Sequence, residues 1–174
     1  MLTIDTPWQK SWTPEFIGTL VFIVREGQVL LIHKKTGHGA GKINAPGGKL
    51  RCGETVLQCA VRETNEEVGV TPSHLKFGCE LRFVEKSGPQ WLGFAFVASG
   101  FFGESSESDE AKPFWVNIEE IPFIQMWQAD AIWLPSLLGG TAVPVANFLF
   151  EDGQLLAHEF VNTPPIWQDL YLGE

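Results

Sequence analysis

Four glutamates are concentrated between Gly48 and Val70, in a chain of which only 19% is charged. Three of them, Glu63, Glu66 and Glu67, stand at positions i, i+3 and i+4, which share one face of a helix. Carboxylates this close repel one another, so the spacing lowers stability unless a cation binds between them. Mg²⁺ prefers oxygen ligands and often works through a few carboxylates together with substrate phosphates. The spacing therefore predicts a divalent-metal site that handles phosphate.

A helix is needed to hold these acids, and the sequence supplies one after Thr55. Gly69 follows its last turn, where a glycine ends helices. Gly47 and Gly48 come just before it and let the backbone approach a ligand closely. We expect a loop–helix–loop whose core-facing residues lie opposite the acids; these are Leu57, Ala60, Val61, Thr64 and Val68.

The remaining elements are mostly strands. β-rich or alternating segments predict strands at Phe16–Val24, Val29–His33, Leu75–Glu85, Trp91–Ala98 and Phe114–Val116, and a hairpin of Val143–Phe150 with Gln154–Phe160. Short helical pieces are expected at Glu119–Trp127 and Asp130–Leu138. This order predicts an α+β fold with a mixed β-sheet sandwiched between helices. We expect the domain to span residues 16–160, with an N-terminal extension at 1–15 and a C-terminal extension at 161–174.

Composition narrows the class of protein. A chain of 174 residues with 44% hydrophobic residues is expected to form one globular domain. The net charge of −9 argues against duplex nucleic acid as a partner, because the surface repels polyanions. We expect no secretory signal and no membrane span. The three cysteines, Cys52, Cys59 and Cys79, form no C-x-x-C pair, which favours a reduced cytoplasmic compartment and excludes a zinc site.

The run from Gly48 to Val70 resembles the signature of the Nudix hydrolases, G-x5-E-x7-R-E-U-x-E-E-x-G-U, in which U is a bulky aliphatic residue. Every defined position fits except Thr64, where an aliphatic residue is usual. Thr can turn its methyl group to the core and donate its hydroxyl to the carbonyl one turn back, so we expect a small loss of stability and no loss of chemistry. The resemblance implies the Nudix fold with its catalytic loop–helix–loop.

The resemblance also implies roles for individual residues. Mg²⁺, with Mn²⁺ as a substitute, is the expected cofactor, and a backbone carbonyl of Gly47 or Gly48 completes its ligand shell. Glu54 and Arg62 are expected to form a salt bridge that fixes the loop against the helix. The general base stays open among Glu66, Glu63 and Glu110. The implied metal ligands are Gly47, Glu63, Glu66, Glu67 and Glu110, the last from the acidic stretch 107–110, which has the alternative reading of an exposed acidic loop.

Three further stretches, at residues 34–44, 107–110 and 121–130, resemble the oxidised-purine nucleoside triphosphate diphosphatases within this family. In that branch an Asn before the signature and an Asp-containing Trp loop read the base. By this resemblance Asn44 contacts the purine edge, Trp127 stacks on the ring, and Asp130 pairs with purine N–H groups. Each has a plainer alternative: a turn residue for Asn44, a core residue for Trp127 and a helix N-cap for Asp130.

Other contacts follow more loosely. Lys34 or Lys35 would hold the triphosphate, His38 in the Gly-rich loop would touch a phosphate or the base, and Trp91 and Phe83 would wall the pocket. The remaining substrate-binding residues implied are Gly48 and Lys49. Two departures stand out: Ala129 replaces the first of two adjacent acids found in animal members, and His38 replaces a frequent aromatic residue.

The expected activity is hydrolysis of an oxidised purine nucleoside triphosphate, such as 8-oxo-dGTP, to the monophosphate and pyrophosphate, which cleans the nucleotide pool. One alternative is another Nudix substrate, such as a nucleoside diphosphate-sugar, ADP-ribose or capped RNA. A second is a nucleotide-binding module without catalysis, which the complete set of signature acids disfavours. The partner is a small nucleotide, with neither duplex nucleic acid nor membrane, and the oligomeric state stays open.

Overall fold

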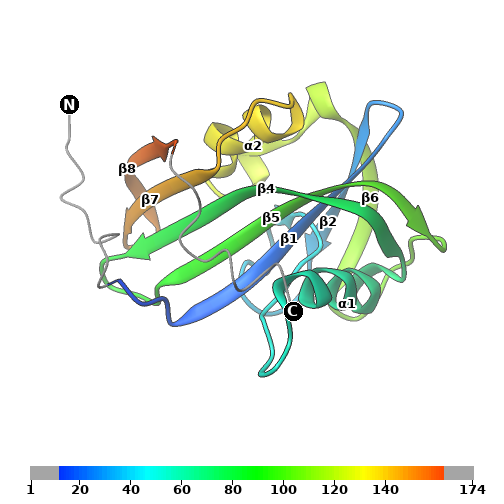
Figure 1. Cartoon of the computed structure of the whole chain (residues 1–174), viewed down its shortest axis with the longest axis horizontal. Coiled ribbons are helices and arrows are strands. Elements are labelled where there is room, and N and C mark those ends of the chain that lie inside the picture. Colours follow the sequence, from blue (N-terminus) through cyan, green and yellow to red (C-terminus); the bar gives the residue numbers. More distant parts are fainter. Residues whose placement is uncertain (1–11, 163–174) are drawn as a thin grey trace.

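The structure is a computed structural model that describes residues 12–162. The expected extensions, 1–15 and 161–174, lie outside this range apart from residues 12–15 and 161–162. The elements follow in the order β1 (Phe16–Arg25), β2 (Gln28–Lys34), β3 (Ile43–Asn44), α1 (Val56–Val68), β4 (Thr71–Glu85), β5 (Trp91–Phe102), β6 (Ala111–Asn117), α2 (Asp130–Leu138), β7 (Val145–Glu151) and β8 (Gln154–Val161) (Figure 1).

The strands of the described chain form a mixed sheet in the order β3-β2-β1-β5-β4-β7-β8, with β6 paired to β2. β1 runs parallel to β5 and β4 runs parallel to β7, whereas the other pairs are antiparallel. β1 and β2 pair only near their connecting turn, through Val24 with Val29 and Arg25 with Gln28. Beyond these pairs the two strands diverge, and Gly47 and Gly48 lie against β1 instead. The predicted α+β fold with a mixed sheet is confirmed.

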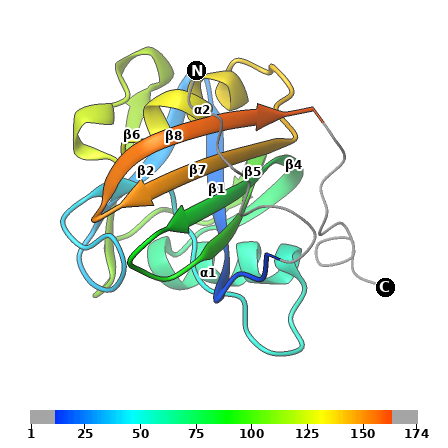
Figure 2. The same ribbon diagram turned by 90° about the vertical axis from the view of Figure 1, so that its left-hand side faces the viewer.

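Each face of the sheet carries its own hydrophobic cluster and its own helix (Figures 1 and 2). The alternation of side chains along β1 shows the division: Val21 and Ile23 pack with α1, whereas Phe22 packs with α2. Phe22 meets Trp133 of α2 edge to face at 5.6 Å between ring centroids. The core therefore lies on both sides of the sheet, which fixes α1 rigidly beside the loop that precedes it.

Local sequence sets the ends of α1. Thr55 and Gln58 form a reciprocal capping box at its start, and Gly69 ends it with a φ of 76°. The hydroxyl of Thr64 donates to the carbonyl of Ala60 at 2.8 Å, so the expected accommodation of Thr at this position is confirmed. One prediction about the buried face is wrong: Leu57 is exposed. Val56 and Cys59 are buried in its place, since the core-facing stripe is rotated relative to the expected one.

Other boundaries also differ from the prediction. The helix expected at Glu119–Trp127 is two short 3₁₀ turns, Ile118–Glu120 and Phe123–Gln125, because Pro122 interrupts the backbone hydrogen bonding. β3 was missed because two residues carry no periodicity. β4 and β5 extend well past the expected ends, since their pairing continues to Thr71 and Phe102.

Candidate active site

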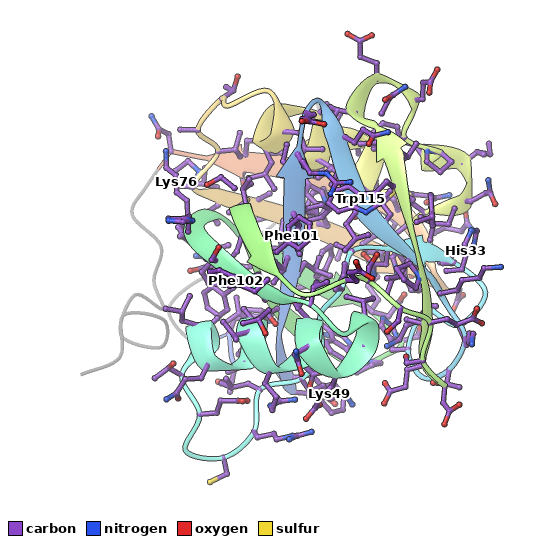
Figure 3. All side chains as sticks on the ribbon, turned by 90° about the vertical axis from the view of Figure 1, so that its right-hand side faces the viewer. His33, Lys49, Lys76, Phe101, Phe102 and Trp115 are labelled. Carbon is purple, nitrogen blue, oxygen red and sulfur yellow. The ribbon has the colours of Figure 1, made fainter. Side chains whose placement is uncertain are left out.

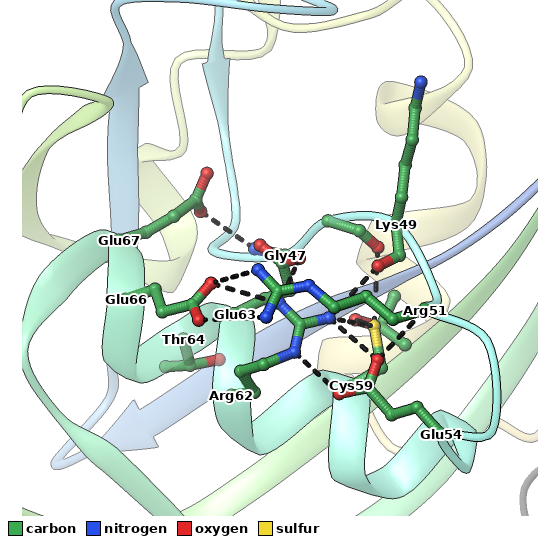
Figure 4. Close-up of polar contacts among 12 residues, drawn as sticks. Gly47, Lys49, Arg51, Glu54, Cys59, Arg62, Glu63, Thr64, Glu66 and Glu67 are labelled. Carbon is green, nitrogen blue, oxygen red and sulfur yellow. Dashed lines mark hydrogen bonds and ion pairs between the residues drawn. The ribbon is translucent and has the colours of Figure 1, made fainter.

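Arg62 stands at the centre of the signature residues and binds three of the acids (Figure 4). It donates to both carboxylate oxygens of Glu54, at 2.6 and 2.8 Å, a paired geometry that fixes orientation as well as distance. These hydrogen bonds lower the pKa of Glu54 to about 2. Arg62 also contacts Glu63 at 2.5 Å and Glu66 at 3.1 Å. The predicted Glu54–Arg62 bridge is confirmed, and it ties the loop at 47–54 to α1.

Glu67 differs from the other acids because it is buried, with only 1% of its side chain exposed. Its carboxylate accepts from the backbone N–H of Gly47 at 3.0 Å (Figure 4). It also forms an ion pair with Lys34 of β2. Burial raises the pKa of Glu67, although both donors oppose that shift. The expectation that all three acids lie opposite the core is therefore wrong for Glu67, since the end of α1 turns this side chain under the loop.

Within residues 12–162, no three acidic side chains currently surround one ion-sized space. Instead Glu63 and Glu66 turn to Arg62, and Glu67 turns to Lys34. The donor set nevertheless fits a hard divalent cation, because every nearby ligand is a carboxylate or carbonyl oxygen. Lys34 shows that a cation is stable here, since its ammonium pairs with Glu67 and lies 3.9 Å from Glu110.

Gly47 and Gly48 leave space that a side chain at either position would fill. A Cβ added to Gly48 would lie 2.3 Å from the carboxyl carbon of Glu63, and one added to Gly47 would lie 1.8 Å from the carbonyl oxygen of Thr19. Only glycine lets the Glu63 carboxylate lie against this backbone. The two glycines thus bring carbonyl oxygens and carboxylates within one small region.

Of the two lysines expected to hold phosphate, only Lys34 lies in the site. Lys35 pairs instead with Glu107 at 2.6 Å and donates to the carbonyl of Ser108. Glu110, from the same acidic stretch, is exposed but borders the site beside Lys34. Within the stretch 107–110, Glu110 therefore borders the site and Glu107 does not.

A cavity of about 630 Å³ is lined by Glu63 and Glu110 and by the predicted base-reading residues. This volume falls within the range of small-molecule sites. Residues that line the cavity beside the signature loop are Lys34, Gly47, Gly48, Lys49, Glu63 and Glu110. Residues from the other end are His38, Asn44, Phe83, Trp91, Trp127 and Asp130, which confirms that Trp91 and Phe83 form part of the wall.

Asp130 is 4% exposed and accepts two hydrogen bonds, from the backbone N–H of Trp127 at 3.1 Å and from Nε1 of Trp133 at 3.0 Å. Burial raises its pKa to about 6. The N-cap alternative is wrong, because α2 begins at Asp130 itself and Ala129 occupies the cap position. Asp130 instead holds Trp127 in place while facing the cavity.

The plainer alternatives for the other two predicted base-reading residues do not match the structure either. Trp127 is half-buried and lines the cavity rather than the core. Asn44 lies in β3 paired with Ile32, not in a turn, and its Oδ1 accepts from the N–H of Ala45 at 2.9 Å. Sequence reasoning missed Phe150 and Gly153, which the β7–β8 hairpin brings to the cavity wall. No motif in the sequence marks them, because strand pairing alone places them there.

Comparison with known proteins agrees with this geometry. The NUDIX domain profile matches residues 14–137, most of the chain. The chain belongs to the Nudix family. It is 44% identical over 121 residues to the oxidized purine nucleoside triphosphate hydrolase of Danio rerio, and 37% identical to that of Mus musculus. Each alignment covers 69% of this chain and 78% of the relative.

The Nudix fold is also evident from solved structures. The MutT protein from Bacillus halodurans superimposes with a TM-score of 0.74 at 27% identity, covering 86% of this chain and 99% of that one. Hydrolases of this family generally need a divalent metal ion and act on small nucleotide substrates. Among the described residues, no helix is long and apolar enough to span a membrane.

Proposed function

We propose that this Nudix protein hydrolyses an oxidised purine nucleoside triphosphate, such as 8-oxo-dGTP, to the monophosphate and pyrophosphate. The observation that carries the proposal is one cavity, which has Gly48 and Glu63 of the signature at one end and the predicted base-reading residues Asn44, Trp127 and Asp130 at the other. A nucleoside triphosphate has the same division, with phosphates at one end and a planar base at the other. The names of the relatives from Danio rerio and Mus musculus support the same substrate class.

Mg²⁺, replaceable by Mn²⁺, is the proposed cofactor. Glu63, Glu66, Glu67, Glu110 and a carbonyl oxygen of Gly47 would hold it. Gly47, Glu63 and Glu110 line the cavity, and Glu66 and Glu67 follow Glu63 on α1. When bound, the ion offsets phosphate charge and lowers the pKa of a coordinated water.

The protein's own groups then have distinct tasks. The hydrogen bonds between Arg62 and Glu54 hold the loop in a fixed position against the helix, so the acids keep their spacing. A carboxylate of Glu66, Glu63 or Glu110 takes the proton of the attacking water as general base. Lys34, now paired with Glu67, supplies positive charge to the triphosphate. Gly48 and Lys49 border the same end of the cavity.

At the other end, Trp127 offers a ring on which a base can stack, worth about 1–3 kcal/mol for such contacts. Asn44 and Asp130 present polar groups to the edge of the base, and a base that leaves buried groups unpaired is rejected. Position 129 is a buried alanine and not a second acid, so Asp130 is the only acid in the Trp loop at residues 121–130. We propose a cytoplasmic location, supported by the free thiols of Cys52, Cys59 and Cys79.

The experiment is product analysis. Purified protein is incubated with 8-oxo-dGTP and Mg²⁺, and the products are separated by ion-exchange chromatography. The proposal predicts 8-oxo-dGMP and pyrophosphate in equal amounts. Release of orthophosphate with the nucleoside diphosphate would contradict the proposed bond cleavage. Binding of the nucleotide without any turnover would favour a non-catalytic module.

A further inference from the structure

His38 stacks on two tryptophans at the base end of the cavity. Its imidazole lies 4.8 Å from the ring centroid of Trp91, with 20° between the planes, and 5.1 Å from that of Trp127, with 16° between them. The three rings are therefore nearly parallel, and the imidazole contacts both indoles at the spacing of stacked aromatic pairs. We call these three residues the Trp–His–Trp stack. Its members come from segments far apart in the sequence.

The two indoles are held firmly, whereas the imidazole is not. Trp91 begins β5 and packs on Phe16 at 4.7 Å between centroids. Trp127 is fixed through its backbone N–H by Asp130. His38, in contrast, is exposed in the loop that joins β2 to β3. The glycines on either side of it, Gly37 and Gly39, have φ values of 72° and 85°, a region that glycine leaves and enters at little cost.

A second feature of Trp91 concerns its indole N–H group. Its indole N–H is buried and has no hydrogen-bond partner among the described residues. A buried donor without an acceptor is unfavourable, so a ligand group that accepts from it would be stabilising. The stacking of His38 against both indoles points to a planar ligand at this end of the cavity, and the unpaired N–H leaves room for an acceptor at the edge of Trp91.

We propose that the base of the incoming nucleotide takes the stacking positions that His38 holds in the free protein, so that Trp91 as well as Trp127 contacts the base. This rests on the proposed function, because it assumes a nucleotide in the cavity. His38 is then a displaceable plug, and not a substrate ligand as the sequence suggested. Trp91 becomes a base-binding residue, which the family signature does not reveal.

The proposal predicts that His38 affects KM but not kcat. A nucleotide binds only to the fraction of molecules in which His38 has moved aside, so the plug weakens the apparent affinity by that fraction. At saturating substrate the plug is already displaced, so its effect falls on KM rather than on kcat. The penalty is the same for every base. His38 therefore does not alter the ratio between 8-oxo-dGTP and dGTP, whereas Trp91 contributes to binding of any purine.

The test compares His38→Ala and His38→Phe with the wild type in Mg²⁺-dependent hydrolysis of 8-oxo-dGTP and dGTP. Binding of 8-oxo-dGMP in EDTA is measured alongside by calorimetry. His33→Ala is the matched control, since His33 is exposed on β2 and does not line the cavity (Figure 3). Its ring also contacts an aromatic ring, that of Phe114, at 4.7 Å between centroids and a tilt of 31°. His38→Ala should lower KM for both triphosphates and Kd for the monophosphate by roughly tenfold, the strength of two aromatic contacts. His38→Phe, which keeps a stacking ring, should not lower them.

Trp91→Leu completes the test with the opposite effect, a rise in KM and Kd of roughly tenfold for purine nucleotides. A rise in Kd for His38→Ala, or a value within twofold of the wild type, would overturn the plug. An unchanged Kd for Trp91→Leu would overturn the second stacking face. If the wild type hydrolyses no triphosphate but His38→Ala still tightens binding of the monophosphate, the proposed function fails and the plug stands.

Discussion

Glu67 accepts a hydrogen bond from the backbone N–H of Gly47 at 3.0 Å, and the same carboxylate pairs with Lys34. One buried carboxylate at the end of α1 thus binds both the glycine loop that precedes the helix and a lysine of β2. Without a metal ion, Lys34 is the cation that makes burial of this carboxylate tolerable. The positive charge at this point therefore has two possible sources, a lysine or a metal ion.

Replacing Lys34 should reveal this exchange. Lys34→Met leaves Glu67 buried without a cation, so we expect the free energy of unfolding in EDTA to fall by roughly 3 kcal/mol. Mg²⁺ should then raise the melting temperature more in the variant than in the wild type. Lys35→Met is the control, since Lys35 pairs with the exposed Glu107. Equal losses in the two variants would refute a special role for Lys34.

Arg62 should matter more than its neighbour Arg51, although both contact Glu66. Arg62→Met removes both hydrogen bonds to Glu54 and leaves the signature acids facing one another. We expect Mg²⁺ affinity to weaken by about 10–100-fold, as for other residues that orient metal ligands. Arg51→Met should change it little, because Arg51 is 60% exposed. Calorimetric titration with Mg²⁺ measures both, and similar affinities in the two variants would count against the assignment.

The signature acids should be needed for turnover but not for folding. Glu66→Gln and Glu67→Gln each keep the shape of the side chain and remove its charge, so we expect kcat to fall by at least ~100-fold. Far-ultraviolet circular dichroism should stay unchanged. Glu26→Gln, in the exposed β1–β2 turn, is the control. Wild-type activity in both signature variants would disprove the proposed metal cluster.

Asp130 should give the protein a specific dependence of stability on pH. Burial raises its pKa from 3.8 to about 6 in the folded state. Since the folded pKa is the higher one, the folded protein keeps the proton after the unfolded chain has lost it. Stability from this group is therefore complete below about pH 4 and is lost as the pH rises to about 6, by roughly 1.4 kcal/mol for each unit of pKa shift.

Asp130→Asn removes this titration and isolates its contribution. We expect the stability of the wild type relative to the variant, measured by urea denaturation, to decline between pH 4 and pH 6.5 and then to level off. Other ionisable groups cancel in the difference. A difference that is constant across this range would show that Asp130 ionises normally in the folded protein.

Features that depend on neighbouring residues in the sequence were predicted correctly. Thr55, Gly69 and the spacing of the glutamates defined α1, and the resemblance to the Nudix signature implied the Glu54–Arg62 bridge. Burial of Glu67 escaped prediction, because it depends on where the preceding loop folds back over the helix. The contacts of His38 with Trp91 and Trp127 escaped it too, since they require three distant segments to meet.

The most direct test of the account is a substrate panel under one set of Mg²⁺ conditions: 8-oxo-dGTP, dGTP, 2-hydroxy-dATP, dATP, ADP-ribose and a UDP-sugar. The account predicts that kcat/KM for 8-oxo-dGTP exceeds that for dGTP by tenfold or more, about 1.4 kcal/mol of differential transition-state binding. Asn44→Ala and Trp127→Ala should each reduce that preference. A higher kcat/KM for ADP-ribose or the UDP-sugar, or equal values for all the triphosphates, would contradict it.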